Sequence, residues 1–160
     1  KSIGNLKARI RMLLLYAYAN SKNLIVVGTG NKTELLCGYF TKFGDGGADI
    51  LPIGDLYKTQ VREMARFLEI PEKIINKVPS AGLWKGQTDE DELGIKYEKL
   101  DKILYGIELG LDKNEISNKV ELPIKEVERI MNMVELTKHK RKFPLIPKIG
   151  YCTVGFDWRE

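Results

Sequence analysis

The sequence has few of the residues that build metal sites or disulfide scaffolds. It contains two cysteines, Cys37 and Cys152, and one histidine, His139, in 160 residues. The cysteines lie far apart and form no Cys-x-x-Cys pair, so neither a zinc site nor a disulfide scaffold is indicated. We interpret both cysteines as packing residues.

Long hydrophobic runs are also absent. The longest, residues 12–17 and 24–28, fall well short of the roughly 20 residues that cross a bilayer. No charged segment followed by an apolar stretch and a cleavage site opens the chain. We therefore expect a cytoplasmic protein with no membrane partner.

The composition is that of a globular protein. Apolar residues make up 43% and charged residues 30%, which excludes a disordered or fibrous chain. The net charge of +4 is too small to indicate a nucleic-acid partner by itself. Basic residues gather at 7–11 and 138–142, and acidic residues at 89–92. Such clusters are typical of solvated faces, although two basic clusters can also hold a polyanionic small molecule such as a nucleotide.

The first half of the chain combines helical and strand patterns. Residues 5–20 have helical spacing, and residues 24–28 resemble a buried parallel strand. A short helical stretch ends at Leu36, and residues 50–53 form a second strand pattern. Asp55 is expected to cap a helix that buries one apolar face and stops before Pro71. This order predicts an α/β protein with a doubly wound parallel sheet.

The second half is predicted to be helical after an irregular segment. Residues 77–94 show no period, and a loop of this length is usually functional or disordered. Helical patterns follow over residues 97–109, 113–120 and 124–140. We expect one domain with an α/β part over residues 1–78, a loop over residues 79–94, and a helical segment with a basic tail over residues 95–160.

A glycine-rich segment, Gly28-Thr-Gly-Asn-Lys-Thr-Glu34, follows the first predicted strand. Open α/β sheets bind ligands at the carboxyl ends of their strands. Glycines let backbone N–H groups approach an anion, and the Thr29 hydroxyl can donate to phosphate or ribose. Glu34 can hold Mg²⁺ together with phosphates. A strand-to-helix turn with a polar cap explains the same residues, so this short match leaves both interpretations open.

A second glycine-rich segment spans residues 40–49. It carries Lys42, Asp45 and Asp49, and it either wraps a ligand or forms a surface loop. Lys58 falls in the first turn of the helix that follows, where a lysine opposes the helix dipole. That position is better explained if the lysine faces an anion, although exposed exceptions are common.

Three further residues have ambiguous roles. His139 is flanked by basic residues, which favours an anion-facing tail over a general base. Trp84 and Trp158 can each stack on a base or pack in a core, and the sequence does not separate these roles.

Seven ordered segments resemble the NAD synthetase family, in its ammonia-dependent type without a fused glutaminase. They span about residues 4–142 and are Gly4-Asn-Leu-Lys-Ala-Arg-Ile-Arg-Met12, Gly28-Thr-Gly-Asn-Lys-Thr-Glu34, Gly38-Tyr-Phe-Thr-Lys-Phe-Gly-Asp-Gly-Gly-Ala-Asp49, Gly54-Asp-Leu-Tyr-Lys58, Pro79-Ser-Ala-Gly-Leu83, Thr88-Asp-Glu-Asp-Glu-Leu-Gly94 and Lys138-His-Lys-Arg141. The resemblance implies the α/β fold of the ATP-pyrophosphatase (adenine nucleotide alpha hydrolase-like) type, with its first strands absent from this chain.

The resemblance also implies a two-step reaction, the last of NAD biosynthesis. ATP adenylates the carboxylate of deamido-NAD (nicotinic acid adenine dinucleotide), and ammonia then displaces AMP to give NAD. Mg²⁺ and cationic side chains would stabilise the charge on the leaving pyrophosphate. The ATP contacts implied are Thr29, Lys58 and Ser80, with Lys58 also catalytic. The magnesium ligand implied is Glu34. The deamido-NAD contacts implied are Arg9, Lys42, Asp49, His139 and Lys140. Ser80 stands where relatives often have threonine, and it keeps the hydroxyl.

One motif of the family does not occur in the sequence. The family carries an upstream Ser-Gly-Gly-x-Asp-Ser loop that grips pyrophosphate and supplies a second metal carboxylate. We therefore expect this chain to be the C-terminal part of a longer synthetase and to be inactive alone.

The helix over residues 5–20 is apolar around much of its circumference, so it needs cover on more than one side. The resemblance suggests a two-fold homodimer, and we expect Leu14 and Tyr18 in its interface. A catalytically dead dimerisation fragment is a compatible interpretation.

A different class of function remains open for the second half. The helical patterns over residues 113–120 and 124–140 are separated by a short break and end in a basic tail. This spacing is typical of a helix-turn-helix and predicts a nucleic-acid-binding module. This alternative ranks lower, because it leaves the glycine-rich segments unexplained. Acidic residues also dilute the second helix, at Glu126, Glu128 and Glu135.

Overall fold

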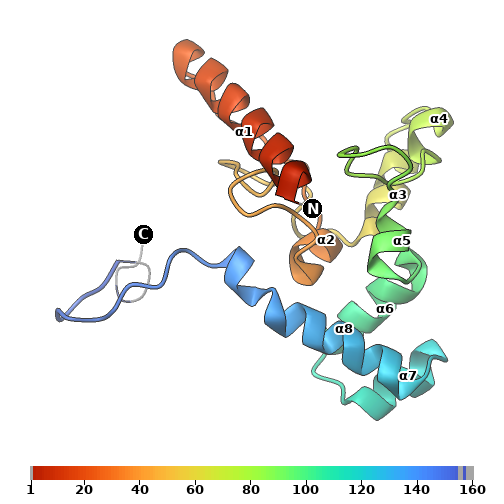
Figure 1. The fold of residues 1–160 in the computed structure, drawn as a ribbon. Helices are drawn as coiled ribbons and strands as arrows, with labels where there is room; N and C mark the ends of the chain where they lie inside the picture. The colour runs from red at the N-terminus through yellow and green to blue at the C-terminus, as the bar shows by residue number, and fades with distance from the viewer. Residues whose placement is uncertain (1, 155–156, 158–160) are drawn as a thin grey trace.

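The computed structural model describes residues 2–154 and 157, so Trp158 lies outside the described residues. Figure 1 shows an assembly of helices joined by irregular segments. Its elements are α1 (Ser2–Lys22), α2 (Lys32–Cys37), α3 (Lys58–Phe67), α4 (Glu72–Ile75), α5 (Asp89–Leu93), α6 (Tyr97–Glu108), α7 (Lys113–Val120), α8 (Ile124–Leu136) and the 3₁₀ helix η1 (Lys138–Arg141). Among the described residues, no helix is long and apolar enough to cross a membrane.

The two predicted strands meet as a short parallel pairing. Val27 and Ile50 form a parallel bridge. The Gly28 amide donates to the Ile50 carbonyl at 2.8 Å, and the Asp49 amide donates to the Val26 carbonyl at 2.9 Å. The direction of pairing agrees with the α/β prediction. A doubly wound sheet needs further parallel strands, with helices on both faces. Residues 2–154 and 157 show only the Val27–Ile50 bridge, so the predicted sheet is not seen in them.

The core lies where α6, α7 and α8 pack together, and these helices lie side by side in Figure 1. One face of α6 supplies Tyr97, Leu100, Ile103 and Leu104, all 0–1% exposed. Each buried side chain of this size contributes about 1.5–3 kcal/mol relative to exposure. The predicted apolar stripe of the last helix is confirmed at its centre, where Val127 and Ile130 are fully buried. That helix ends at Leu136, and η1 continues the chain.

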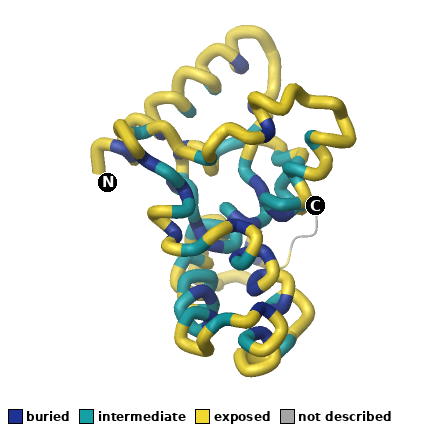
Figure 2. The backbone as a smooth tube through the Cα atoms, turned by 90° about the vertical axis from the view of Figure 1, so that its right-hand side faces the viewer, coloured by how far each residue is buried: buried dark blue, intermediate teal, exposed yellow. Residues whose placement is uncertain are grey.

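Helix α1 is longer than predicted and exposed over most of its length. It projects away from the other helices in Figure 1, and Figure 2 shows that buried residues lie mainly where elements meet. Its buried residues are Gly4, Ala8 and Ala19. Leu14 is 67% exposed and Tyr18 is 63% exposed. The apolar face of α1 that carries Leu14 and Tyr18 is therefore open to contact with another chain.

Helix α3 corrects two predictions. Its N-cap is Tyr57, whereas the Asp55 carboxylate pairs with Lys32 at 2.8 Å. The helix buries no residue, and Met64 and Leu68 of the predicted face are 43% and 59% exposed, so the predicted buried face is wrong. The stop before Pro71 is confirmed.

Two short helices were not predicted. Helices α4 and α5 span only four and five residues, too few to show a period. Helix α5 falls within the segment expected to be a loop. The Thr88 hydroxyl accepts from the Asp91 amide, and acidic residues fill the first turn, as the positive end of a helix favours.

Candidate functional site

A cavity of about 570 Å³ lies between α1, the segment after the parallel bridge, and residues 80–89. Its wall includes Thr29, Glu34, Lys58 and Ser80. These four residues are the predicted ATP and magnesium contacts, and they come from segments far apart in the sequence. The fold therefore brings that part of the predicted site together.

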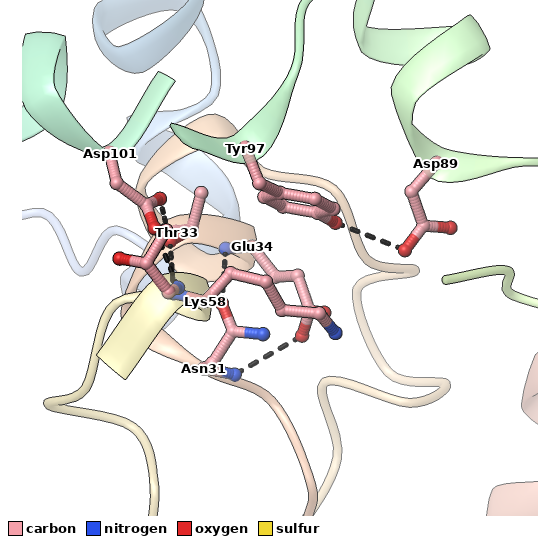
Figure 3. A network of polar contacts seen from close by, with 8 residues as sticks. Asn31, Thr33, Glu34, Lys58, Asp89, Tyr97 and Asp101 are labelled. Atoms are coloured by element: carbon pink, nitrogen blue, oxygen red, sulfur yellow. Dashed lines mark hydrogen bonds and ion pairs between the residues drawn. The ribbon is translucent and has the colours of Figure 1, made fainter. Parts of the chain in front are cut away.

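Glu34 and Lys58 form an ion pair on the wall of this cavity. The Lys58 amine lies 3.3 Å from Glu34 Oε1, and the two side chains are 21% and 18% exposed. The other oxygen, Glu34 Oε2, accepts from the Asn31 amide at 3.1 Å and completes the capping box of α2. The Lys58 amine also lies over the Tyr97 ring, 5.5 Å from its centre (Figure 3). A cation and a carboxylate are thus held beside a space of ligand size.

Asp89 also lines this cavity and contacts the buried Tyr97, and the sequence analysis missed both residues. The Tyr97 hydroxyl donates to Asp89 Oδ2 at 3.0 Å. Burial and the nearby Asp89 charge raise the pKa of Tyr97, so its hydroxyl remains a proton donor. Within the described residues, Asp89 Oδ1 is buried and has no hydrogen-bond partner. The available signal was the acidic run 89–92, which a solvated surface explains equally well.

The donor set allows one mode of magnesium binding. Among residues 2–154 and 157, no three His, Cys, Asp or Glu side chains are grouped so as to hold a metal ion. Mg²⁺ commonly uses only one or two carboxylates and completes its shell with water and substrate phosphates. Glu34 on the cavity wall fits that mode, in which the substrate supplies further ligands.

The five residues predicted to hold deamido-NAD do not line the main cavity. Three of them link α1, the second glycine-rich segment and η1. Arg9 Nη2 donates to the Lys42 carbonyl at 3.4 Å, and the Lys42 amine donates to the His139 carbonyl at 2.8 Å. The Lys140 amine donates to the Gly38 carbonyl at 2.6 Å, and burial lowers its pKa. These basic residues therefore gather in space, partly through contacts to backbone oxygens.

Asp49, the fifth of these residues, is engaged in structural contacts. Its Oδ2 accepts from the Val26 amide at 2.6 Å, and its Oδ1 accepts from the Tyr16 hydroxyl at 3.1 Å. Both contacts brace the parallel pairing and α1. The structure thus shows a supporting role for Asp49 at the edge of the site.

A second cavity, of about 230 Å³, adjoins the first. Lys140 and Trp84 line it, and Tyr39 and Asp45 line both cavities. Trp84 is therefore placed on a cavity wall. The two cavities are therefore neighbours that share lining residues.

The cavity lies beside a glycine-rich turn that follows a parallel pairing, and it is lined by a lysine, a carboxylate and two hydroxyls. This arrangement is typical of the class of α/β proteins that bind phosphate groups. The chain belongs to the NAD synthase family, whose model matches residues 2–144. That match runs through α7, α8 and η1. It leaves the helix-turn-helix alternative without support.

Several relatives are similar over nearly all of the chain. The NH(3)-dependent NAD(+) synthetase of Sulfolobus acidocaldarius is 55% identical over 157 residues, which are 98% of this chain and 56% of that protein. The synthetase of the same name from Methanococcoides burtonii is 57% identical over 143 residues, which are 89% of this chain and 54% of that protein. The chain therefore spans about half the length of the curated relatives that it matches.

Solved structures agree with this placement. The NMN synthetase from Francisella tularensis has a TM-score of 0.77 and 47% identity, covering 91% of this chain and 56% of that one. The NH3-dependent NAD synthetase from Campylobacter jejuni has a TM-score of 0.72 and 34% identity, covering 92% and 55%. Together with the family match, these structures imply the ATP-pyrophosphatase type of α/β fold for this chain.

Proposed function

We propose that the protein is an ammonia-dependent ligase that amidates deamido-NAD to NAD with ATP, forming AMP and pyrophosphate. The observation that carries this proposal is the cavity lined by Thr29, Glu34, Lys58 and Ser80 in a member of the NAD synthase family. We further propose that the reaction takes place in the cytoplasm.

The chemistry has two balanced steps. A carboxylate oxygen of deamido-NAD attacks the α-phosphorus of ATP, and pyrophosphate leaves with the electron pair of the broken P–O bond. Ammonia then attacks the acyl carbon, AMP leaves, and one proton is released. Both steps move negative charge onto phosphate, so cations and N–H donors fixed before the reaction lower the barrier.

The residues of the cavity suit these demands. The Lys58 amine would neutralise a phosphate oxygen, and the hydroxyls of Thr29 and Ser80 would donate to phosphate or ribose. Glu34 would hold Mg²⁺, which supplies charge neutralisation between the phosphates when it is bound. The Lys58–Glu34 ion pair supports this assignment. On ligand binding, Lys58 would exchange the Glu34 carboxylate for a negative phosphate, and Glu34 would exchange the Lys58 amine for positive Mg²⁺.

The second substrate would lie along the adjoining cavity. Lys140 lines that cavity, and the contacts that join Arg9, Lys42 and His139 place further positive charge next to its lining residues Thr41 and Lys140, which supports a deamido-NAD site there. Asp49 would act as a structural brace between α1 and the parallel pairing. The second cavity shares a wall with the first, which would bring the reacting groups of the two substrates together.

We also propose a homodimer that uses the exposed face of α1 at Leu14 and Tyr18. A solvent-facing apolar helix supports a partner of this kind, because burial of such a face is favourable.

An assay of the intact gene product tests the proposal. With deamido-NAD, ATP, Mg²⁺ and ammonia, we expect NAD, AMP and pyrophosphate in equal amounts. Without ammonia, NAD formation stops, while exchange of labelled pyrophosphate into ATP continues if the adenylate forms first. Release of ADP and phosphate would overturn the adenylation mechanism. The 160-residue chain, assayed in parallel, is expected to show no turnover.

A second candidate substrate follows from the comparison with the Francisella tularensis NMN synthetase. The same chemistry on nicotinic acid mononucleotide would give NMN. The ratio of kcat/KM for the two acids decides between them, and we expect deamido-NAD to be preferred by at least about tenfold, or about 1.4 kcal/mol. A preference for the mononucleotide would reassign the substrate and keep the mechanism.

A further inference from the structure

The first turn of α3 is capped by side chains from two other helices. The first amides of a helix have no partner within it. The N-cap residue Tyr57 makes no side-chain cap bond, and its hydroxyl donates to Glu108 at 2.5 Å. Instead, the Lys58 amide donates to Thr33 Oγ1 of α2 at 2.9 Å. The Thr59 amide donates to Asp101 Oδ2 of α6 at 2.8 Å.

Asp101 closes these contacts into one buried network. The Thr33 hydroxyl donates to Asp101 Oδ1 at 2.6 Å, so both carboxylate oxygens accept (Figure 3). Thr33 is 0% exposed and Asp101 is 5% exposed. Water is therefore not available to replace a lost partner, and each bond in the network is expensive to leave unmade. A carboxylate at the N-terminus of a helix is also favoured by the helix dipole.

Apart from the N-cap residue Tyr57, which packs in the core, few buried contacts fix the direction of α3. The helix buries no residue. Its ion pair between Arg62 and Glu98, at 2.7 Å, is partly exposed and contributes little for that reason. The buried network at the first turn is thus the main polar anchor of this helix.

This anchor lies directly beside the candidate active site. Lys58 is the first residue of α3, and Glu34 follows Thr33 on α2. Because the network holds both backbones, it sets where the Lys58 amine meets Glu34, 3.3 Å away. We propose that Thr33 and Asp101 are positioning residues that aim the Lys58 amine into the cavity. This inference deepens the proposed function and rests on it for the role of Lys58.

A cycle of variants in the intact protein tests the positioning role. Thr33→Val keeps the shape of the side chain and removes the hydroxyl, whereas Thr33→Ser keeps the hydroxyl. We expect Thr33→Val to lower kcat by about tenfold or more with the KM for ammonia nearly unchanged, and Thr33→Ser to retain activity. In a Lys58→Ala background, Thr33→Val is expected to cause no further loss. Losses that multiply in the double variant would overturn the proposal.

A stability control separates positioning from general damage. Ile103→Val trims a buried side chain on α6 without touching the polar network, and it is expected to lower Tm while kcat stays the same. If Ile103→Val lowers kcat as much as Thr33→Val does at equal loss of stability, the network has no special role.

A second readout does not depend on turnover. Acetylation of the Lys58 amine, followed by mass spectrometry, reports how firmly it is held, with exposed Lys125 as the internal reference. We expect Thr33→Val and Asp101→Asn to raise the Lys58 rate by about threefold or more, and Ile103→Val to leave it unchanged. An unchanged Lys58 rate in both network variants would overturn the proposal. If the wild-type protein makes no NAD, the proposed function fails, and this labelling still decides whether the network positions the amine.

Discussion

Gly38 offers a sharp test of how α2 and η1 are held together. It ends α2 with a left-handed backbone, at φ 63°. A Cβ atom placed there would lie 2.7 Å from Thr137 Cγ2 and 2.8 Å from Thr137 Oγ1. Both distances are well inside van der Waals contact. Thr137 is the N-cap of η1, which carries His139 and Lys140, so this close approach helps to set the position of these basic residues.

The expected cost of Gly38→Ala has two parts. A left-handed backbone costs an L-residue about 1–2 kcal/mol. Overpacking against Thr137 adds about 1–3 kcal/mol. Reduced entropy of the unfolded chain returns about 0.4–1 kcal/mol. The free energy of unfolding should fall by about 3 kcal/mol, which lowers Tm by about 6–12 °C at this chain length.

Gly110→Ala is the matched control. Gly110 has a similar φ of 72°, and a Cβ there would meet nothing within 4 Å. Only the backbone strain remains, so we expect a loss of about 1 kcal/mol and a Tm lower by about 2–4 °C. Thermal and urea unfolding followed by circular dichroism measure both variants. Equal losses in the two would refute the claim that contact with Thr137 matters.

The other predictions concern the site, the assembly and the thiols. Lys58→Ala in the intact protein is expected to lower kcat by about 10²–10³-fold, because it removes a preorganised cation, and turnover near wild type would mark an ordinary lysine. Leu14→Glu combined with Tyr18→Glu is expected to dissociate the dimer in sedimentation equilibrium, whereas a wild-type monomer or a dimer indifferent to both changes would place the interface elsewhere. Cys152 is exposed, so its interpretation as a packing residue is wrong, whereas Cys37 is buried. Burial raises the pKa of Cys37 from 9.0 to about 12, so a thiol reagent should modify only Cys152 in the native protein, and two rapidly reacting thiols would contradict this. Because the folded pKa of Cys37 lies above its ordinary value of 9.0, the stability it contributes is complete below about pH 9 and is lost as the pH rises toward about 12.

Helices with a strong local signal were predictable from the sequence. Residues 113–120 were predicted as a helix, and α7 spans Lys113–Val120. Its Asp112 cap accepts from the Asn114 and Glu115 amides, so both the cap and the helix lie within one short stretch. The stripe of α8 was visible for the same reason, since its buried residues recur at helical spacing. The division of the chain at residues 79 and 95 stays a prediction.

Elements that depend on remote partners were not predictable. Asp55 has the residue type of a cap, but its carboxylate pairs with Lys32. The true caps of α3 come from Thr33 and Asp101, which no local pattern connects with it. The candidate site likewise contains residues that the sequence suggested and residues that only the fold identified. The types of Glu34 and Lys58 suggested binding, whereas the place of Asp89 on the cavity wall and its contact with Tyr97 needed the fold.

The sequence by itself determined the family, the glycine-rich segments and the helices with a clear period, because each is encoded in residues close together along the chain. The tertiary structure alone decided which polar groups are satisfied by partners far away in the sequence. An amide such as that of Thr59 donates to whichever buried acceptor the packing provides, and here that acceptor is a carboxylate 42 residues away. The direction of the Lys58 amine is therefore a property of how α2, α3 and α6 pack, since burial makes each of those hydrogen bonds obligatory.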